Sequence, residues 1–255
     1  MNEVNKVLGI AVAEVGYLEK KSNEMLDHKT ANAGRNNYTK YARDMDAISG
    51  FYNGKKQGYA WCDVFVDWLF VKAFGVARAK ELLCQPSNSL GAGCGYSMNY
   101  YINKDRFFKE PKVGDQIFFK SESGSICHTG IVYEIIDSYV YTIEGNTSSA
   151  SGVVANGGCV ANKKYKKTYE RIAGYGRPNY AEEREEFEVS KTYKNGSTPE
   201  VVYAETSLKT KVGSLDARET CECLAIVNGR YLVKYKVNGT DHYKCGFVKY
   251  HGGVK

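Results

Sequence analysis

Two side chains in distant parts of the chain have the types needed for nucleophilic catalysis. Cys62 lies at the start of a strongly apolar segment, residues 61–74, which is followed by Gly75. We expect this segment to form a buried helix, because apolar residues occupy most of its circumference and glycine is common just beyond a helix end. Backbone N–H groups and the helix dipole would stabilise a thiolate at its first turn. Without a partner, however, a cysteine in an apolar helix is more often a core residue.

A cysteine nucleophile needs a general base, and histidine is the usual choice. His128 opens the run 128–133, which predicts a strand, and a rigid sheet can hold its imidazole against a helix end. The alternative for His128 is an ordinary hydrogen-bonded residue at a strand end. The other histidines of the chain fall in a polar loop, an expected turn and the last residues; they are His28, His242 and His251.

The base also needs a polar neighbour that fixes its tautomer. Glu144 and Asn146 end the next strand-like run and are two residues apart, so both can face the same side of a strand. We expect this strand to pair with the one that carries His128. The alternative, which is commoner for isolated polar residues, is a role in forming turns. Together the four residues predict acyl transfer from an amide to water, with Cys62 as the nucleophile.

The elements expected to position these residues predict an α+β fold. Apolar residues at helical spacing between Val4 and Leu18 predict a first helix that ends near Gly16. From Pro111 the pattern changes to strands separated by Gly, Ser and Asp, which is typical of an antiparallel sheet. A polar stretch, residues 20–37, predicts a long loop that borders a site. Further helices are predicted at 38–45, 77–83 and 96–102, and strands at 113–119, 129–136 and 139–144.

Length and composition predict two domains. The chain has 255 residues, and the Glu-rich segment 181–188 is typical of a solvated linker. We therefore expect a first domain at 1–180, a linker at 181–190 and a second domain at 191–255. Short strand patterns and the turn signal Asn228-Gly229 predict a small all-β barrel for the second domain. Its strands are predicted at 200–203, 208–212, 221–227, 231–237 and 244–248.

Charge and hydropathy argue against two classes of partner. The net charge of +6 is spread along the chain and forms no basic stripe, so nucleic-acid binding is not predicted. No apolar run is long enough to cross a membrane, so no membrane insertion is expected. The apolar stretch 7–13 resembles part of a signal peptide, but it lacks a positively charged flank and is better explained by the first helix.

Cysteine spacing predicts neither a metal nor a cofactor. The chain has eight cysteines but no CxxC pair of the kind that builds zinc sites. Cys221 and Cys223 can share one face of a strand, so a metal or redox site with Cys245 is an alternative. We favour scattered thiols in a protein made in a reducing cytosol.

Four ordered segments resemble the CHAP family of cysteine- and histidine-dependent amidohydrolases and peptidases. They are YAWCDVFVDWLF, PKVGDQIFF, CHTGIVY and YTIEGN, and the resemblance covers most of residues 1–180. It implies a papain-like α+β fold, with Cys62 as nucleophile, His128 as base, and Glu144 with Asn146 as orienting and polar groups. The segments EVGYLEKKSN and NAGRNNYTKYARD resemble phage-type members of the family. The C-terminal tail resembles, more weakly, bacterial SH3-like wall-binding domains.

The resemblance implies a peptidoglycan hydrolase that cuts an amide bond of the bacterial cell wall. It would act as an N-acetylmuramoyl-L-alanine amidase or a peptidoglycan endopeptidase, with the peptide stem, and also the glycan, as the parts of the wall that it contacts. A phage endolysin of this kind would stay in the host cytoplasm until lysis and then act on the wall. The alternatives are a non-catalytic wall-binding protein, a bacterial autolysin and a cysteine protease that acts on ordinary proteins.

One departure from the family concerns calcium. Some phage-type members carry an Asp-rich calcium loop before the nucleophile, whereas residues 54–60 here read GKKQGYA. Calcium is therefore not implied, although Asp44 and Asp46 are conceivable ligands. For the oxyanion, the backbone N–H of Cys62 is the expected first donor, and Gln57 or Tyr59 is a candidate for the second.

Overall fold

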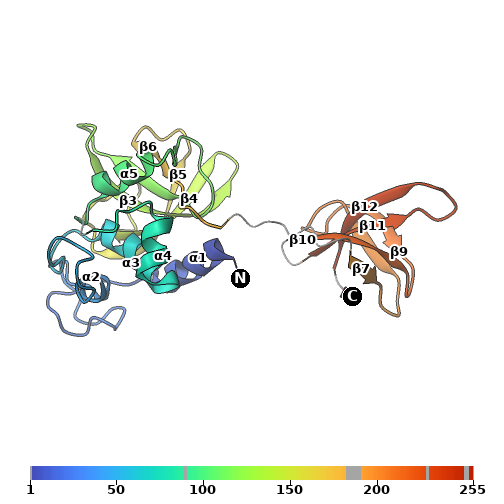
Figure 1. Ribbon diagram of the computed structural model, residues 1–255, viewed down its shortest axis with the longest axis horizontal. Helices are drawn as coiled ribbons and strands as arrows, with labels where there is room; N and C mark the ends of the chain where they lie inside the picture. Colours follow the sequence, from blue (N-terminus) through green and yellow to red (C-terminus); the bar gives the residue numbers. More distant parts are fainter. Residues whose placement is uncertain (1, 89–90, 182–190, 228–229, 250–252, 255) are drawn as a thin grey trace. The chain divides into compact units, whose positions relative to one another are not determined.

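The computed structural model describes residues 2–88, 91–181, 191–227, 230–249 and 253–254. The chain divides into two compact units, Met1–Ala181 and Glu182–Lys255, which are coloured blue to yellow and orange to red in Figure 1. Apart from Ala181, the linker predicted at 181–190 lies outside the described residues.

The first unit combines helices with an antiparallel sheet, so the predicted α+β class is confirmed. Its helices are α1 (Glu3–Glu14), α2 (Lys40–Asp46), α3 (Cys62–Phe74), α4 (Val76–Leu82) and α5 (Cys94–Ile102). The six-stranded sheet has the order β1-β6-β2-β3-β4-β5, and each neighbouring pair is antiparallel. The strands are β1 (Phe107–Phe108), β2 (Gln116–Lys120), β3 (Ile126–Ile136), β4 (Tyr139–Thr147), β5 (Cys159–Lys166) and β6 (Ile172–Gly176).

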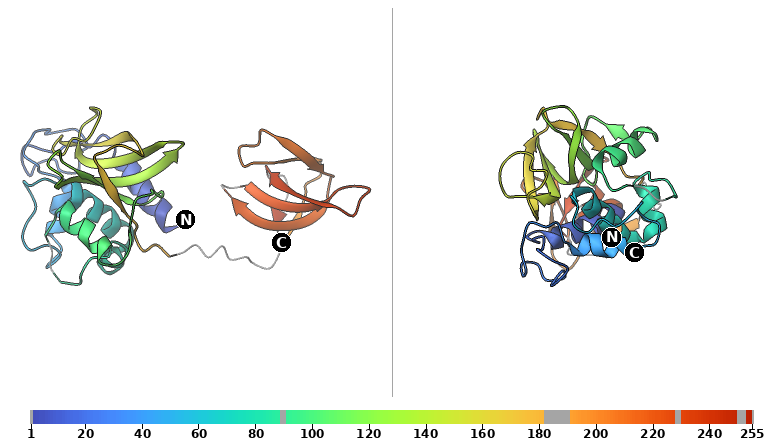
Figure 2. Two further views of the ribbon diagram at one scale, coloured as in Figure 1. Left: turned by 90° about the horizontal axis from the view of Figure 1, so that it is seen from above. Right: turned by 90° about the vertical axis from the view of Figure 1, so that its left-hand side faces the viewer.

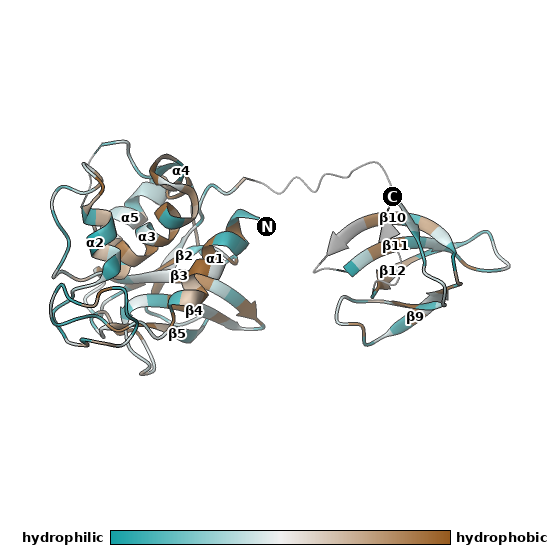
Figure 3. Ribbon diagram, turned by 90° about the horizontal axis from the view of Figure 1, so that it is seen from below, coloured by the Kyte–Doolittle hydropathy of each residue, from teal (hydrophilic) through white to brown (hydrophobic). Residues whose placement is uncertain are grey.

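The first helix ends close to Gly16, as the sequence predicts. Asn2 caps α1 by accepting a hydrogen bond from the backbone N–H of Asn5 at 2.7 Å. The helix ends at Glu14, because Val15 turns to extended backbone and Gly16 adopts φ +89°. Figure 3 shows both hydrophobic and hydrophilic residues along α1, and the buried ones include Val7 and Ala11. This is the amphipathic helix expected of a segment packed on a core.

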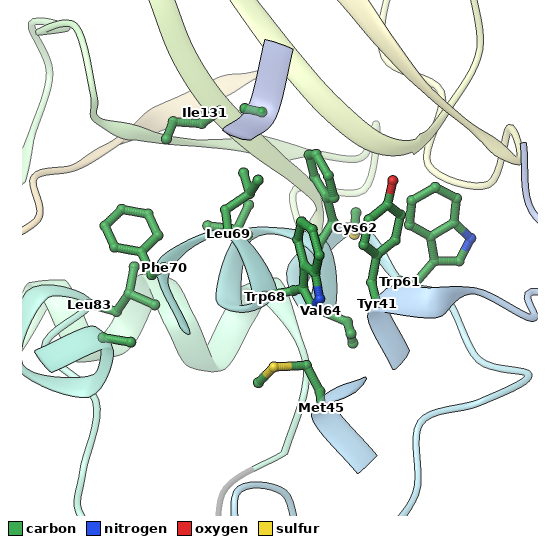
Figure 4. Packing of buried hydrophobic residues seen from close by; sticks show 14 of the residues in the cluster. Tyr41, Met45, Trp61, Cys62, Val64, Trp68, Leu69, Phe70, Leu83 and Ile131 are labelled. Atoms are coloured by element: carbon green, nitrogen blue, oxygen red, sulfur yellow. The ribbon is translucent and has the colours of Figure 1, made fainter. Parts of the chain in front are cut away.

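The buried helix α3 lies at the centre of the first unit, as predicted. It contacts the other four helices together with β3 and β4. Figure 2 shows the helices of the first unit, coloured blue to green, beside its yellow-green strands. At its start, the ring of Tyr41 from α2 packs against Trp61 and Trp68, with ring centroids 5.5 and 4.9 Å apart (Figure 4). Burying several aromatic rings stabilises the position of this helix end against the sheet.

Both faces of the sheet are covered. Phe118, Ile131 and Ile143 belong to the core shared with the helices. Phe119 and Val132, on the other face, pack in a second buried cluster. Strands buried on two sides need apolar residues at successive positions, as at residues 117–119 of β2 and 131–133 of β3.

The second unit is a seven-stranded antiparallel sheet in the order β13-β7-β10-β11-β12-β8-β9. Its core contains Val202, Val233 and Val248, all fully buried. The predicted turn Asn228-Gly229 lies outside the described residues, but the strands on either side pair with Val227 opposite Arg230. The strands are β7 (Lys191–Lys194), β8 (Glu200–Tyr203), β9 (Lys211–Leu215), β10 (Thr220–Val227), β11 (Arg230–Lys236), β12 (Tyr243–Val248) and β13 (Gly253–Val254).

Membrane insertion was not expected from the sequence. Throughout the part of the chain that the structure describes, no helix combines the length and apolarity that a membrane crossing requires.

Candidate functional site

Cys62 is the first residue of α3, and its side chain is 4% exposed. The preceding residue, Trp61, occupies the N-cap position, but its side chain makes no capping hydrogen bond. Instead the indole N–H of Trp61 donates to the buried carboxylate of Glu19 at 2.9 Å, which fixes the ring. Because no N-cap side chain accepts from the first turn of α3, its backbone N–H groups can stabilise negative charge at Cys62 or on a bound substrate.

His128 and Glu144 form a fully buried pair on the neighbouring strands β3 and β4. The Nε2 atom of His128 donates to Oε2 of Glu144 at 3.0 Å. Thr142 donates to the other carboxylate oxygen at 2.6 Å, and Tyr165 donates to Oε2 at 3.3 Å. These bonds fix the carboxylate, and the carboxylate fixes the imidazole. With Nε2 committed as a donor, Nδ1 is the nitrogen left to act as a base.

The Nδ1 atom of His128 is buried and has no hydrogen-bond partner. Leaving such an atom unpaired costs about 1–3 kcal/mol, so its persistence calls for a functional explanation. On the same strand face, the His128 ring stacks on Phe119 with centroids 5.9 Å apart. The ring is therefore held on one side by apolar packing and on another by Glu144, while its basic nitrogen stays available.

Two glycines allow β4 to approach both β3 and the start of α3. A Cβ atom on Gly130 would lie 2.5 Å from Cγ of Glu144, and one on Gly145 would lie 2.6 Å from Cβ of Phe65 and 2.8 Å from the Trp61 ring. The missing side chain at Gly130 makes room for the Glu144 side chain. The one at Gly145 lets the strand touch residues on either side of Cys62. Sequence reasoning did not single out these glycines, although a glycine inside a strand is a known signal of close approach.

Asn146 differs from Glu144 in its contacts. Its backbone is left-handed, with φ +53°, and its carbonyl accepts from the N–H of Gly157 at 2.9 Å. Its side-chain oxygen accepts from the N–H of Gly158 at 3.3 Å, and its buried Nδ2 has no partner. The contacts of Asn146 thus hold the 157–158 turn, and the partner of His128 is Glu144.

Asp63 ties the start of α3 to two neighbouring elements. Its Oδ2 accepts from the N–H of Gly93 at 2.8 Å and from the hydroxyl of Ser97 at 2.9 Å, both at the start of α5. Its Oδ1 accepts from the Gln116 amide of β2 at 3.3 Å. Burial raises the pKa of Asp63 to about 6, although these hydrogen bonds act in the opposite direction. Sequence reasoning did not identify Asp63 because a lone aspartate in a helix carries no distinctive signal.

Cys94, the first residue of α5, links the regions of Cys62 and His128. The neighbouring Cys62 side chain and burial raise the pKa of the Cys94 thiol, whereas the charge of His128 lowers it. Both Cys62 and His128 therefore lie near enough to Cys94 to influence the ionisation of its thiol. No hydrogen bond joins Nδ1 of His128 to Cys62, and in unliganded enzymes such bonds often tighten only when substrate binds.

The residues suggested as a second oxyanion donor behave differently from each other. The side-chain nitrogen of Gln57 donates to Asn23 at 2.9 Å and its oxygen accepts from the N–H of Thr39 at 2.9 Å, so this amide is committed elsewhere. Tyr59 is 66% exposed, which leaves its side chain accessible to a substrate. His28, in the polar loop, accepts from the backbone N–H of Ala31 at 3.0 Å.

Asp44 and Asp46, the conceivable calcium ligands, both accept hydrogen bonds from protein donors. Asp46 accepts from the backbone N–H groups of Lys56 and Gln57 at 2.7 and 3.1 Å, and Asp44 accepts from the Trp68 indole at 2.9 Å. Within the described ranges, no group of three or more His, Cys, Asp or Glu side chains is arranged to hold a metal ion.

The second-unit cysteines do not form the alternative site. Cys245 pairs with Lys234, which in turn pairs with Glu222. Since facing residues in adjacent strands point to the same side, Cys245 lies on the face of Glu222 and not on that of Cys221 and Cys223.

Comparison with protein families identifies a CHAP domain at residues 54–146, a segment that contains Cys62, His128, Glu144 and Asn146. No curated protein matches the chain. Among solved structures, "The crystal structure of Ly7917" matches with a TM-score of 0.40 at 13% identity, over 98% of this chain and 97% of that one. A second structure, of Ly7917 "with the hydrolyzing product of MDP", matches with a TM-score of 0.39 at 14% identity, over the same shares of the two chains.

Proposed function

We propose that this protein is a cysteine-dependent peptidoglycan hydrolase. The observation that carries the proposal is the buried His128–Glu144 pair with its unpartnered Nδ1, inside a CHAP domain whose Cys62 begins an uncapped helix. A nucleophile, a base and an orienting carboxylate are the three groups that acyl transfer requires. In this proposal Glu144 orients His128, and Asn146 supports the strand end that carries Glu144.

The first half of the reaction forms a thioester. The Cys62 thiolate attacks an amide carbonyl carbon of the wall peptide, and the developing oxyanion accepts hydrogen bonds from N–H groups at the start of α3. Protonated His128 then gives its Nδ1 proton to the amine nitrogen as the C–N bond breaks. Glu144 stabilises the imidazolium at this stage through the bond at Nε2.

The second half returns the enzyme to its starting state. His128 removes a proton from water, the resulting hydroxide attacks the thioester carbon, and the C–S bond breaks. The products are a carboxylate and an amine, and Cys62 is again a thiolate. The bond cut is either the muramoyl–alanine amide or an amide within the peptide stem or cross-bridge.

Cys62→Ala tests the proposal with the full-length protein and purified cell walls. We expect the release of new amino groups to fall by about 10⁴-fold or more, because no other group replaces the nucleophile. Cys245→Ala is the matched control, since Cys245 is exposed in the second unit. Hydrolysis by a folded Cys62→Ala variant would refute the proposal. Mass spectrometry of the released fragments distinguishes amidase from endopeptidase cleavage, and casein as substrate tests for a general protease.

We further propose that the second unit is an SH3-like wall-binding domain of a phage-type endolysin. Its all-β architecture, and the fact that it forms a compact unit of its own, support this proposal. Removing residues 182–255 should weaken sedimentation with intact walls while leaving cleavage of soluble wall fragments unchanged. Equal wall binding by both forms would contradict this role.

A further inference from the structure

Two buried cysteines meet at the starts of two helices. Cys62 begins α3 and Cys94 begins α5, and their side chains are 4% and 8% exposed. The neighbouring Cys62 side chain is the largest cause of the raised pKa of the Cys94 thiol. The residues lie 32 positions apart in the chain, so only the packing of α5 against α3 brings them together.

Asp63 holds the two helix starts in this arrangement. It follows Cys62 in the chain, and its Oδ2 accepts hydrogen bonds from Gly93 and Ser97, which lie on either side of Cys94 in the sequence. Asp63 and Ser97 are both 3% exposed, so water competes little for these bonds. The Cys94 thiol is therefore fixed beside the proposed nucleophile by bonds on both sides of it.

We propose that Cys94 is the resolving thiol of Cys62, so that oxidation by a peroxide converts the pair into a reversible disulfide and switches the site off. This inference rests on the proposed function for its consequence, because a bridged Cys62 cannot attack an amide. The disulfide itself can be detected without any activity measurement.

The chemistry balances in two steps. The Cys62 thiolate attacks one oxygen of hydrogen peroxide, the O–O bond breaks, and a sulfenic acid and hydroxide form. The Cys94 sulfur then attacks the sulfenic sulfur, an S–S bond forms, and the S–O bond breaks. The released hydroxide takes the Cys94 proton and leaves as water. Two electrons pass from the two sulfurs to the peroxide, and a dithiol reductant returns them.

The environment of Cys94 suits a resolving role. The neighbouring Cys62 side chain and burial raise the pKa of the Cys94 thiol, which favours its protonated form. A protonated thiol can donate a hydrogen bond to a neighbouring thiolate and so stabilise it. Without a resolving thiol at Cys94, a sulfenic acid on Cys62 proceeds toward irreversible oxidation. Cys94 would thus protect the site as well as silence it.

The test treats the full-length protein with hydrogen peroxide, blocks remaining thiols and maps the tryptic peptides by mass spectrometry. Cys62 falls in peptide 57–72, and Cys94 falls in peptide 81–104, which also contains Cys84. We expect a cross-linked pair of these peptides, lighter than their sum by about 2 Da for the two hydrogens lost. Because Cys84 shares the peptide, Cys84→Ser is the matched control and should retain the bridge.

Cys94→Ser should lose both the bridge and the recovery of activity by dithiothreitol, with each variant normalised to its own untreated activity. Cys94→Ala provides a second comparison if the serine variant fails to fold. Absence of the 57–72 to 81–104 bridge in oxidised wild type would overturn the inference, as would its loss in Cys84→Ser. A bridge in a protein that never cleaves walls would support the inference and refute the proposed function instead.

Discussion

The two units of the chain satisfy their buried polar groups in different ways. In the second unit, buried Asn195 donates from Nδ2 to the backbone oxygens of Thr198 and Asp216 at 3.1 and 2.7 Å. In the first unit, Nδ1 of His128 and Nδ2 of Asn146 are buried without partners. Within the described ranges, every buried side-chain nitrogen or oxygen that lacks a partner lies in the first unit.

This difference distinguishes the first unit, which carries the candidate site, from the second unit. An unpaired buried polar atom costs free energy that a purely structural domain avoids. The first unit bears that cost beside Glu144, where a free imidazole nitrogen has a use. The second unit, whose core is built from residues such as Val233, has no such unpaired buried side-chain atom among its described residues. Substitutions in each unit can test whether the unpaired buried atoms of the first unit mark a catalytic site.

His128→Ala should reduce wall hydrolysis by about 10⁴-fold, because it removes both the proton acceptor and the donor to the leaving amine. His242→Ala is the control, since His242 is exposed in the second unit. The measurement is the release of amino groups from purified walls at saturating substrate. A comparable loss of wall hydrolysis in His128→Ala and His242→Ala would contradict a catalytic role specific to the first unit.

Asp63→Asn should change how the stability of the first unit depends on pH. Burial raises the pKa of Asp63 to about 6 in the folded protein, so the folded state holds this proton more tightly than the unfolded state. The wild type should therefore lose stability as pH rises from about 4 to 6, by on the order of 2 to 3 kcal/mol, and Asp63→Asn should lose less.

Denaturant unfolding followed by tryptophan fluorescence measures this effect. Both tryptophans, Trp61 and Trp68, belong to the first unit, so the signal reports that unit alone. Asp241→Asn, at an exposed position of the second unit, should keep the wild-type pH dependence. The same pH dependence in Asp63→Asn would show that other groups cause it.

Gly145→Ala should destabilise the first unit by about 1–3 kcal/mol and lower its activity. The added Cβ would lie 2.6 Å from Cβ of Phe65, so β4 must move away from the start of α3. Gly9→Ala is the control, because a Cβ at Gly9 meets nothing within 4 Å and alanine favours the helix. Tryptophan fluorescence and wall hydrolysis measure the two effects, and unchanged values for both would contradict the close approach.

Val233→Ala should have the smallest effect on catalysis. Removing a fully buried side chain from the second unit should lower that unit's stability by about 1–2 kcal/mol. The tryptophan transition and cleavage of soluble wall fragments should not change. Far-ultraviolet circular dichroism follows the unfolding of both units. If Val233→Ala shifts the tryptophan transition as well, the two units unfold together.

The sequence predicted much of the fold from local patterns. The predicted bounds lie close to the observed ones for the helices α2 to α5, the strands β2 to β4 and the strand β8. Strand β5 was not predicted, because its lysine-rich sequence lacks the apolar run of a buried strand. It forms through pairing with β4, which positions residues such as Lys163 by non-local hydrogen bonds.

The predicted pairing of strands at the site is found in the structure. The strand of Glu144 does pair with that of His128, and the two side chains meet. The roles of Cys62, His128, Glu144 and Asn146 in catalysis stay predictions until the variants are measured. Asp63 and Cys94 had no local signal, since neither belongs to a motif of fixed spacing.

The sequence by itself determined which residues end or begin elements: a thiol at the start of an apolar helix, an imidazole near the start of a strand, and a carboxylate near a strand end. Periodicity and composition are local properties, so they specify such positions. Only the tertiary structure decided that Glu144 and not Asn146 is bonded to His128, and that Cys94 lies beside Cys62. These outcomes depend on the left-handed backbone at Asn146, the close approach at Gly130 and Gly145, and the packing of α5 on α3, all of which join residues far apart in the chain.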